Sequence, residues 1–137
     1  MHTHQMIATH PLSQGAPTGV LIRAIEECYD CSQACTTCAD ACMAEARVET
    51  LVSCIRACLD CADVCIACGQ TSSRSTGASH HLTIRMLATC AEACRVCAEE
   101  CERHAEHMEH CAVCAEACRD CERACSEAVL SLTPRIQ

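Results

Sequence analysis

Nineteen cysteines among 137 residues are the chemically active groups that dominate this sequence. They fall into four groups, and within each group gaps of three and four residues strictly alternate. Such spacing places side chains along one face of an α-helix, where a helical bundle ordinarily carries leucine. Thiolates are soft ligands that select Cu(I), Zn(II) or iron–sulfur clusters. The candidate ligands are Cys28, Cys31, Cys35, Cys38, Cys42, Cys54, Cys58, Cys61, Cys65, Cys68, Cys90, Cys94, Cys97, Cys101, Cys111, Cys114, Cys118, Cys121 and Cys125.

Two explanations without metal fit this pattern poorly. Cysteine can act as a small buried apolar residue, but that accounts for one or two positions rather than an unbroken register. Disulfides within a helix are disfavoured because Cβ atoms one turn apart lie about 5–6 Å from each other, whereas a disulfide needs about 3.5–4.5 Å. The cysteine count of 19 is also odd. Metal binding is therefore the favoured interpretation, and the short C-x2-C-x2-C runs of bacterial iron–sulfur proteins are absent.

Charge distinguishes copper from zinc. One Cu(I) per thiolate would neutralise all 19 sulfurs. Zinc takes four sulfurs per ion, so it would occupy about four or five sites and leave roughly −9 to −11 of buried charge. The sequence thus predicts a multinuclear Cu(I) store that holds up to about one ion per cysteine. A general zinc or heavy-metal buffer remains an alternative, as does a thiol redox protein, which would need one distinguished low-pKa cysteine.

The four cysteine groups predict four helices, at about 19–46, 49–69, 80–105 and 107–131. A polar stretch at 69–79 separates the middle two, with Thr18 and Ser79 as expected N-caps. Because the other joins are short, neighbouring helices should be antiparallel. The expected fold is all-α, an antiparallel up-down-up-down four-helix bundle with a Cys-lined core over residues 18–133. Residues 1–17 form a separate N-terminal arm.

The two ends of such a bundle differ in composition. At one end, which we name the plug end, the cysteine register continues into aliphatic residues: Leu21, Ala24, Leu87, Ala128 and Leu132. At the other end, which we name the mouth end, the cysteine register gives way to methionine and histidine side chains. We expect copper to enter there past Met43, His104, His107, Met108 and His110. The alternative is that these histidines are ordinary turn residues. The arm residues His2, His4, Met6 and His10 could bind copper or be solvated bystanders.

A second apolar stripe lies on the second predicted helix, rotated about 100° from its cysteines. It predicts a contact between subunits through Val52, Ile55, Leu59 and Ile66. The net charge of −8 and a single aromatic residue argue against nucleic acid as a partner. No apolar run approaches the ~18 residues of a membrane span, and the N-terminus lacks an export signal, so we expect a cytoplasmic protein.

The alternating stripe resembles that of the bacterial copper storage proteins, and the lack of an export signal resembles their cytosolic branch. The resemblance extends over about residues 20–130, and its units include CYDCSQAC from Cys28 and CRDCERAC from Cys118. It implies Cu(I) bound inside the bundle, a homotetramer, and storage or detoxification rather than catalysis. Each of the 19 cysteines then corresponds to a position in the family's core-facing stripe. The third group has one cysteine fewer than the others, and its register continues to His104 instead.

Overall fold

The computed structural model describes residues 1–12, 19–75 and 80–134. The expected N-caps Thr18 and Ser79 lie outside these residues. Within them the structure is helical and contains no strand. In chain order the elements are α1 (Thr3–Ala8), α2 (Gly19–Met43), the 3-10 turn η1 (Val48–Thr50), α3 (Val52–Ser73), α4 (His81–Glu102) and α5 (Glu109–Leu132).

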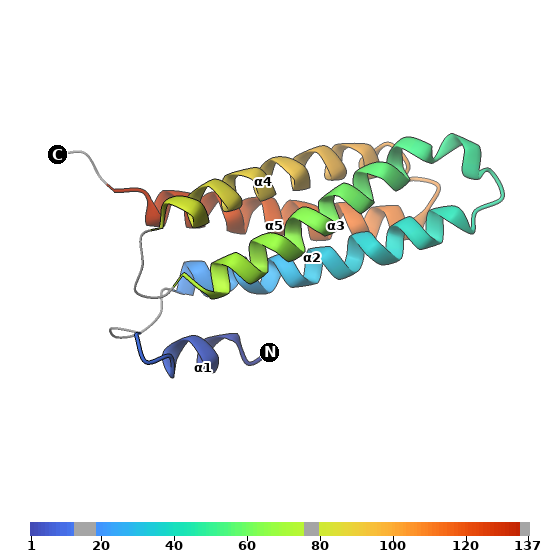
Figure 1. The fold of residues 1–137 in the computed structure, drawn as a ribbon. Coiled ribbons are helices and arrows are strands. Elements are labelled where there is room, and N and C mark those ends of the chain that lie inside the picture. Colours follow the sequence, from blue (N-terminus) through green and yellow to red (C-terminus); the bar gives the residue numbers. More distant parts are fainter. Residues whose placement is uncertain (13–18, 76–79, 135–137) are drawn as a thin grey trace.

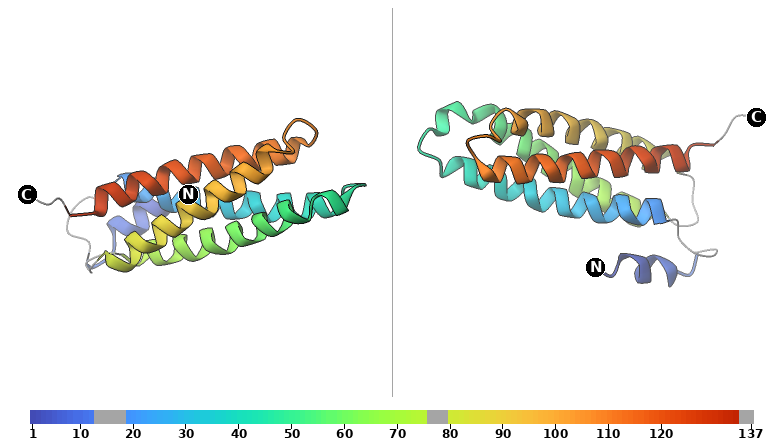
Figure 2. Two further views of the ribbon diagram at one scale, coloured as in Figure 1. Left: turned by 90° about the horizontal axis from the view of Figure 1, so that it is seen from above. Right: turned by 180° about the vertical axis from the view of Figure 1, so that it is seen from behind.

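Helices α2 to α5 form the predicted up-down-up-down bundle, which confirms the expected fold class (Figure 1). Helix α2 packs against α3 and α5, and α4 packs against the same two helices. Each helix therefore has two antiparallel neighbours around a common axis, as the further views also show (Figure 2). The start of α2 and the end of α3 gather at the plug end, and the connections 44–51 and 103–108 form the mouth end.

Helix boundaries differ from the sequence expectation by a few residues. The first bundle helix ends at Met43 rather than near 46, and the next begins at Val52 after a 3-10 turn. That helix then runs to Ser73, into a stretch expected to be a loop. The hydroxyls of Thr71 and Ser73 donate to the carbonyls of Ala67 and Gly69 at 3.0 and 2.7 Å. These bonds let polar residues continue the helix.

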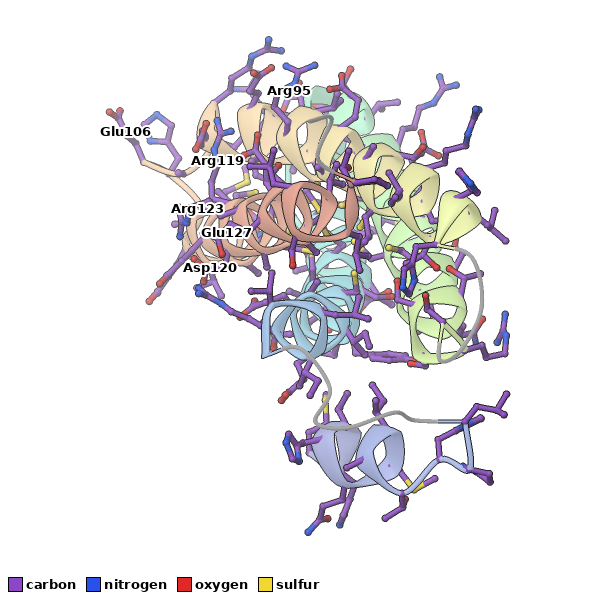
Figure 3. The ribbon with its side chains drawn as sticks, turned by 90° about the vertical axis from the view of Figure 1, so that its left-hand side faces the viewer. Arg95, Glu106, Arg119, Asp120, Arg123 and Glu127 are labelled. Atoms are coloured by element: carbon purple, nitrogen blue, oxygen red, sulfur yellow. The ribbon has the colours of Figure 1, made fainter. Side chains whose placement is uncertain are left out.

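The bundle buries its cysteine face and keeps its charges outside. Viewed from the plug end, the sulfur atoms lie between the helices, whereas Arg95, Arg119 and Arg123 project from the outer side of α4 and α5 (Figure 3). Arg119 holds these two helices together with hydrogen bonds of 2.9 and 3.0 Å to the Glu102 carboxylate. Alanines such as Ala24, Ala98 and Ala128 are fully buried, and their small side chains let the helix backbones approach closely.

The plug end contains more than the expected aliphatic residues. Leu87 is fully buried there, and Leu21 and Leu132 are partly buried against the core cluster to which it belongs. Ser75 and Thr83 are buried as well, and the Thr83 hydroxyl donates to Ser75 Oγ at 2.9 Å. Hydrogen-bonded hydroxyls thus connect the end of α3 to the start of α4.

The N-terminal arm carries a helix that docks on the bundle. Ile7 of α1 is buried against Ile22 and Ile25 of α2, with Tyr29 packed beside them. Ile25 therefore faces the arm rather than the thiol core. This small apolar cluster is separate from the thiol core.

Candidate metal centre

All 19 cysteines are buried and free, and their side chains form one continuous core. Alternation of three and four residues keeps every sulfur on the inner face of its helix, because this spacing follows the helical repeat. The most exposed of them, Cys38, is only 2% accessible. The core is therefore a column of thiols along the bundle axis rather than a set of separate sites.

The thiols lie in groups small enough to hold single ions. In each group the Sγ atoms are all within 4.8 Å of one another. Five such quartets together include every cysteine except Cys42, Cys54 and Cys111: Cys28/Cys68/Cys90/Cys125, Cys31/Cys65/Cys94/Cys121, Cys31/Cys35/Cys61/Cys118, Cys35/Cys97/Cys114/Cys118 and Cys38/Cys58/Cys101/Cys114. Several members belong to two quartets, so one sulfur can bridge neighbouring ions.

Sulfur–sulfur separations match those around a thiolate-bound metal. The Sγ atoms of Cys35 and Cys118 are 3.6 Å apart, and those of Cys31 and Cys61 are 4.0 Å apart. Metal–sulfur bonds of about 2.3 Å place ligands about 3.8 Å apart in a tetrahedral site and about 4.0 Å apart in a trigonal one. The geometry accepts either coordination, so the identity of the metal depends on charge.

Within the described part of the chain, no buried cationic side chain is present to balance thiolates. Among the described residues the buried polar side chains are Ser72, Ser75 and Thr83, and none is cationic. A buried charge without a partner is costly, so an empty core must hold its protons. Filling the core then requires cations that replace those protons.

Burial and neighbouring thiols set the pKa of each sulfur. Burial raises the pKa of Cys42 to about 11, and it also raises the pKa of Cys111. Deeper in the core, hydrogen bonding with Cys118 and Cys121 lowers the pKa of Cys31. The pKa of Cys35 is raised by its hydrogen bonds with Cys114 and Cys118. Neighbouring thiols in the core thus differ in pKa, so some hold their protons more tightly than others.

Of the methionines and histidines predicted at the mouth end, some are exposed to solvent and others pack against the core. Met43 is 52% exposed and His107 is also exposed, whereas Met108 packs against the thiol core. His104, His107 and Met108 line a pocket of about 470 Å³ together with Glu45 and residues of the 44–51 connection. Leu51 is fully buried beneath this end, so the mouth is partly apolar.

His110 lies closest to the thiols. Its Nδ1 is 3.4 Å from Cys38 Sγ and 3.6 Å from Cys111 Sγ. Its Nε2 is buried and makes no hydrogen bond with any described residue. A side groove of about 380 Å³ between α2 and α5 reaches His110, Cys38 and Cys114. The imidazole is thus placed between solvent and the outer thiols.

Carboxylates accompany these histidines, and the sequence reasoning missed them. Glu100 Oε1 is 3.5 Å from His104 Nε2, and Glu45 Oε1 is 3.9 Å from His110 Nε2. Glu100 precedes His104 by one helical turn, a spacing that the sequence displays. The Glu45–His110 pair joins the first connection to α5, so no local spacing predicts it.

A helical bundle with a continuous thiol core defines a soft-metal-binding protein. The model of the copper storage protein family matches residues 19–130, and the chain belongs to this family. No helix among the described residues is long and apolar enough to cross a membrane. Comparison with curated proteins gives no match.

Solved structures of copper storage proteins are similar over most of the chain. One is Ccsp from Streptomyces lividans loaded with 10 copper equivalents, with 47% identity, a TM-score of 0.88, and coverage of 96% of this chain and 99% of that one. Another, a cytosolic copper storage protein from Streptomyces lividans with five coppers, has 52% identity, a TM-score of 0.81, and coverage of 83% and 95%. Cu(I)-bound BsCsp3 has 33% identity, a TM-score of 0.68, and coverage of 76% and 92%.

Proposed function

We propose that this protein stores and buffers Cu(I) in its thiol core and so protects against excess copper. The observation that carries this function is a column of 19 buried free thiols with no buried cation among the described residues. All 19 cysteines are the proposed ligands. Cu(I) balances each thiolate singly, and shared quartet members let one sulfur bridge two ions.

An anaerobic titration of the fully reduced protein with Cu(I), in competition with a chromogenic chelator, tests this function. Saturation near one copper per cysteine is the expected result. A parallel titration with Zn(II) is the control, since the quartets also suit tetrahedral coordination. Saturation at about four or five ions with equal or tighter zinc binding would instead support a general metal buffer.

We propose that copper enters at the mouth end past Met43, His104, His107, Met108 and His110. Thioether and imidazole groups can hold Cu(I) and pass it to thiolates. His110 supports this path because its Nδ1 lies 3.4 Å from Cys38 Sγ. The position of Met108 against the core provides a second inward contact.

Replacement of Met43, His104 and His107 by leucine tests the proposed path. Loading of the variant should be slower in stopped-flow measurements, while the number of coppers bound at saturation stays the same. His4→Leu is the matched control, because His4 lies on α1 at the opposite end. Equal loading rates for the triple variant and the parent protein would refute this role of the mouth end.

We further propose a cytosolic homotetramer that uses the outer face of α3. Val52, Leu59 and Ile66 are 52%, 45% and 36% exposed on that face. Ile55 packs partly against the protein's own core and contributes less. Sedimentation equilibrium should give a tetramer mass, and Leu59→Lys should lower it. A monomeric parent protein would rule out this assembly.

A further inference from the structure

The docked arm creates a pocket outside the thiol core. It has a volume of about 410 Å³ and lies between α1 and the bundle. The arm contributes Met1, His2, Met6 and His10 to its lining, and the bundle contributes Ile25 and Tyr29. Figure 1 places α1 beside the start of α2, far from the connections at the mouth end.

Three of the arm side chains that line the pocket are Met6 of α1 and the flanking His2 and His10. His2, Met6 and His10 are spaced four residues apart, which brings side chains to the same face of a helix. The Met6 amide donates to the His2 carbonyl at 3.0 Å, and the His10 amide donates to Ile7 at 3.2 Å. These bonds tie His2 and His10, which flank α1, to the two ends of the helix. Burial of Ile7 against α2 holds the arm on the bundle, and Met6 beside it stays 68% exposed at the edge of the pocket.

The chemistry of this pocket suits a soft monovalent cation. Its ligands are imidazole nitrogens and thioether sulfurs, and no carboxylate is among the lining residues. Calcium and magnesium require oxygen ligands, so the pocket disfavours them. The aromatic ring of Tyr29 can also attract a cation through its face.

We propose a second Cu(I) site at this position, with His2, Met6 and His10 as ligands and Met1 beside them. The site is additional to the proposed storage core. Because it lacks thiolates, it binds copper more weakly than the core does and exchanges it more readily.

The surroundings of His10 provide a reporter for this site. Its Nδ1 accepts a hydrogen bond from the Leu12 amide at 3.0 Å, which assigns the ring proton to Nε2. Copper bound at His10 Nδ1 would occupy the nitrogen lone pair that now accepts the hydrogen bond from the Leu12 amide. Copper bound at Nε2 moves the ring proton to Nδ1. Either mode breaks the bond, so the Leu12 amide signal must shift when copper binds.

The test uses the full chain with its cysteines already saturated with Cu(I), under anaerobic conditions. Further Cu(I) is added as its acetonitrile complex, and the methionine methyl and backbone amide NMR signals are followed. One additional equivalent should shift the methyls of Met1 and Met6 and the amide of Leu12. In Met6→Leu the affinity should fall at least about tenfold, since loss of even an outer-shell partner costs that much.

His4→Gln is the matched control, because His4 is absent from the pocket lining and the variant should bind as the parent does. The Ile7 methyl signal verifies that α1 remains docked in each variant. Unchanged Met1 and Met6 methyls would overturn the proposal, as would equal weakening by His4→Gln and Met6→Leu. The methyls report on the arm alone, so failure here is distinguishable from failure of the core to store copper.

Discussion

At the scale of single residues, Cys42 and Cys111 hold their protons more tightly than free cysteines do. Burial raises the pKa of Cys42 from 9.0 to about 11, and that of Cys111 also rises. The folded protein therefore retains these protons at a pH where the unfolded chain has lost them. Copper must displace a proton at each such sulfur, which makes its binding stronger as the pH increases.

This pKa difference predicts how pH affects the copper-free protein. Between pH 9 and about 11 the unfolded chain ionises Cys42 while the folded chain does not, so stability should fall across that interval. Thermal unfolding of the reduced protein, followed by circular dichroism, measures the change. Copper-loaded protein is the control, since metal-bound sulfurs no longer titrate. A melting temperature that is constant or rises over this interval would contradict the prediction.

At the scale of elements, the contact between α2 and α3 depends on a glycine. A Cβ added at Gly69 would lie 3.1 Å from Cε2 and 3.2 Å from Cζ of Tyr29, closer than ordinary contacts. The same side chain packs against the cluster of Ile7, Ile22 and Ile25. Gly69 therefore gives Tyr29, the only aromatic residue of the sequence, room to pack against α3.

A double-mutant cycle tests this packing. Gly69→Ala alone should destabilise the protein, because the steric conflict outweighs the gain in helix propensity. In a Tyr29→Ala background the same change should stabilise it by up to about 1 kcal/mol, since alanine is the better helix former. Chemical denaturation of the four proteins gives the coupling energy, expected at about 0.5–3 kcal/mol. Equal effects in both backgrounds would show that Tyr29 does not constrain position 69.

At the scale of the whole molecule, the bundle must be stable before copper arrives. Its core consists mainly of protonated thiols and alanines, with Ile25, Leu51 and Leu87 the largest fully buried side chains. Protonated cysteine behaves as a small apolar residue, so this core can form without metal. Copper then adds stability by binding only the folded state.

We therefore expect the reduced, copper-free protein to show a helical circular dichroism spectrum. Its melting temperature should increase with each addition of Cu(I). The chelator-stripped protein after reloading is the control for irreversible damage. A random-coil spectrum in the absence of copper would mean that the metal, rather than the sequence, organises the bundle.

The cysteine spacing predicts most of the bundle, because a register that alternates three and four allows only a helix with one buried face. The spacing does not predict the docking of α1, which depends on Ile7 meeting Ile22 and Ile25 across distant sequence. It also misses the extension of α3, where hydroxyl-to-carbonyl bonds support a polar segment. At the mouth end, the closeness of His110 to Cys38 depends on how α2 and α5 pack.

The absence of buried cations among the described residues has an electrical consequence. If each Cu(I) replaces one proton, the copper-free and copper-loaded proteins carry the same net charge. A partner protein could then not distinguish the two forms by their overall charge. Isoelectric focusing should then place both forms at one position, near the pI of about 5.4 expected from the sequence. A zinc ion held by four thiolates would displace four protons but bring only two positive charges. Each zinc ion would therefore make the net charge more negative and shift the band toward acidic pH.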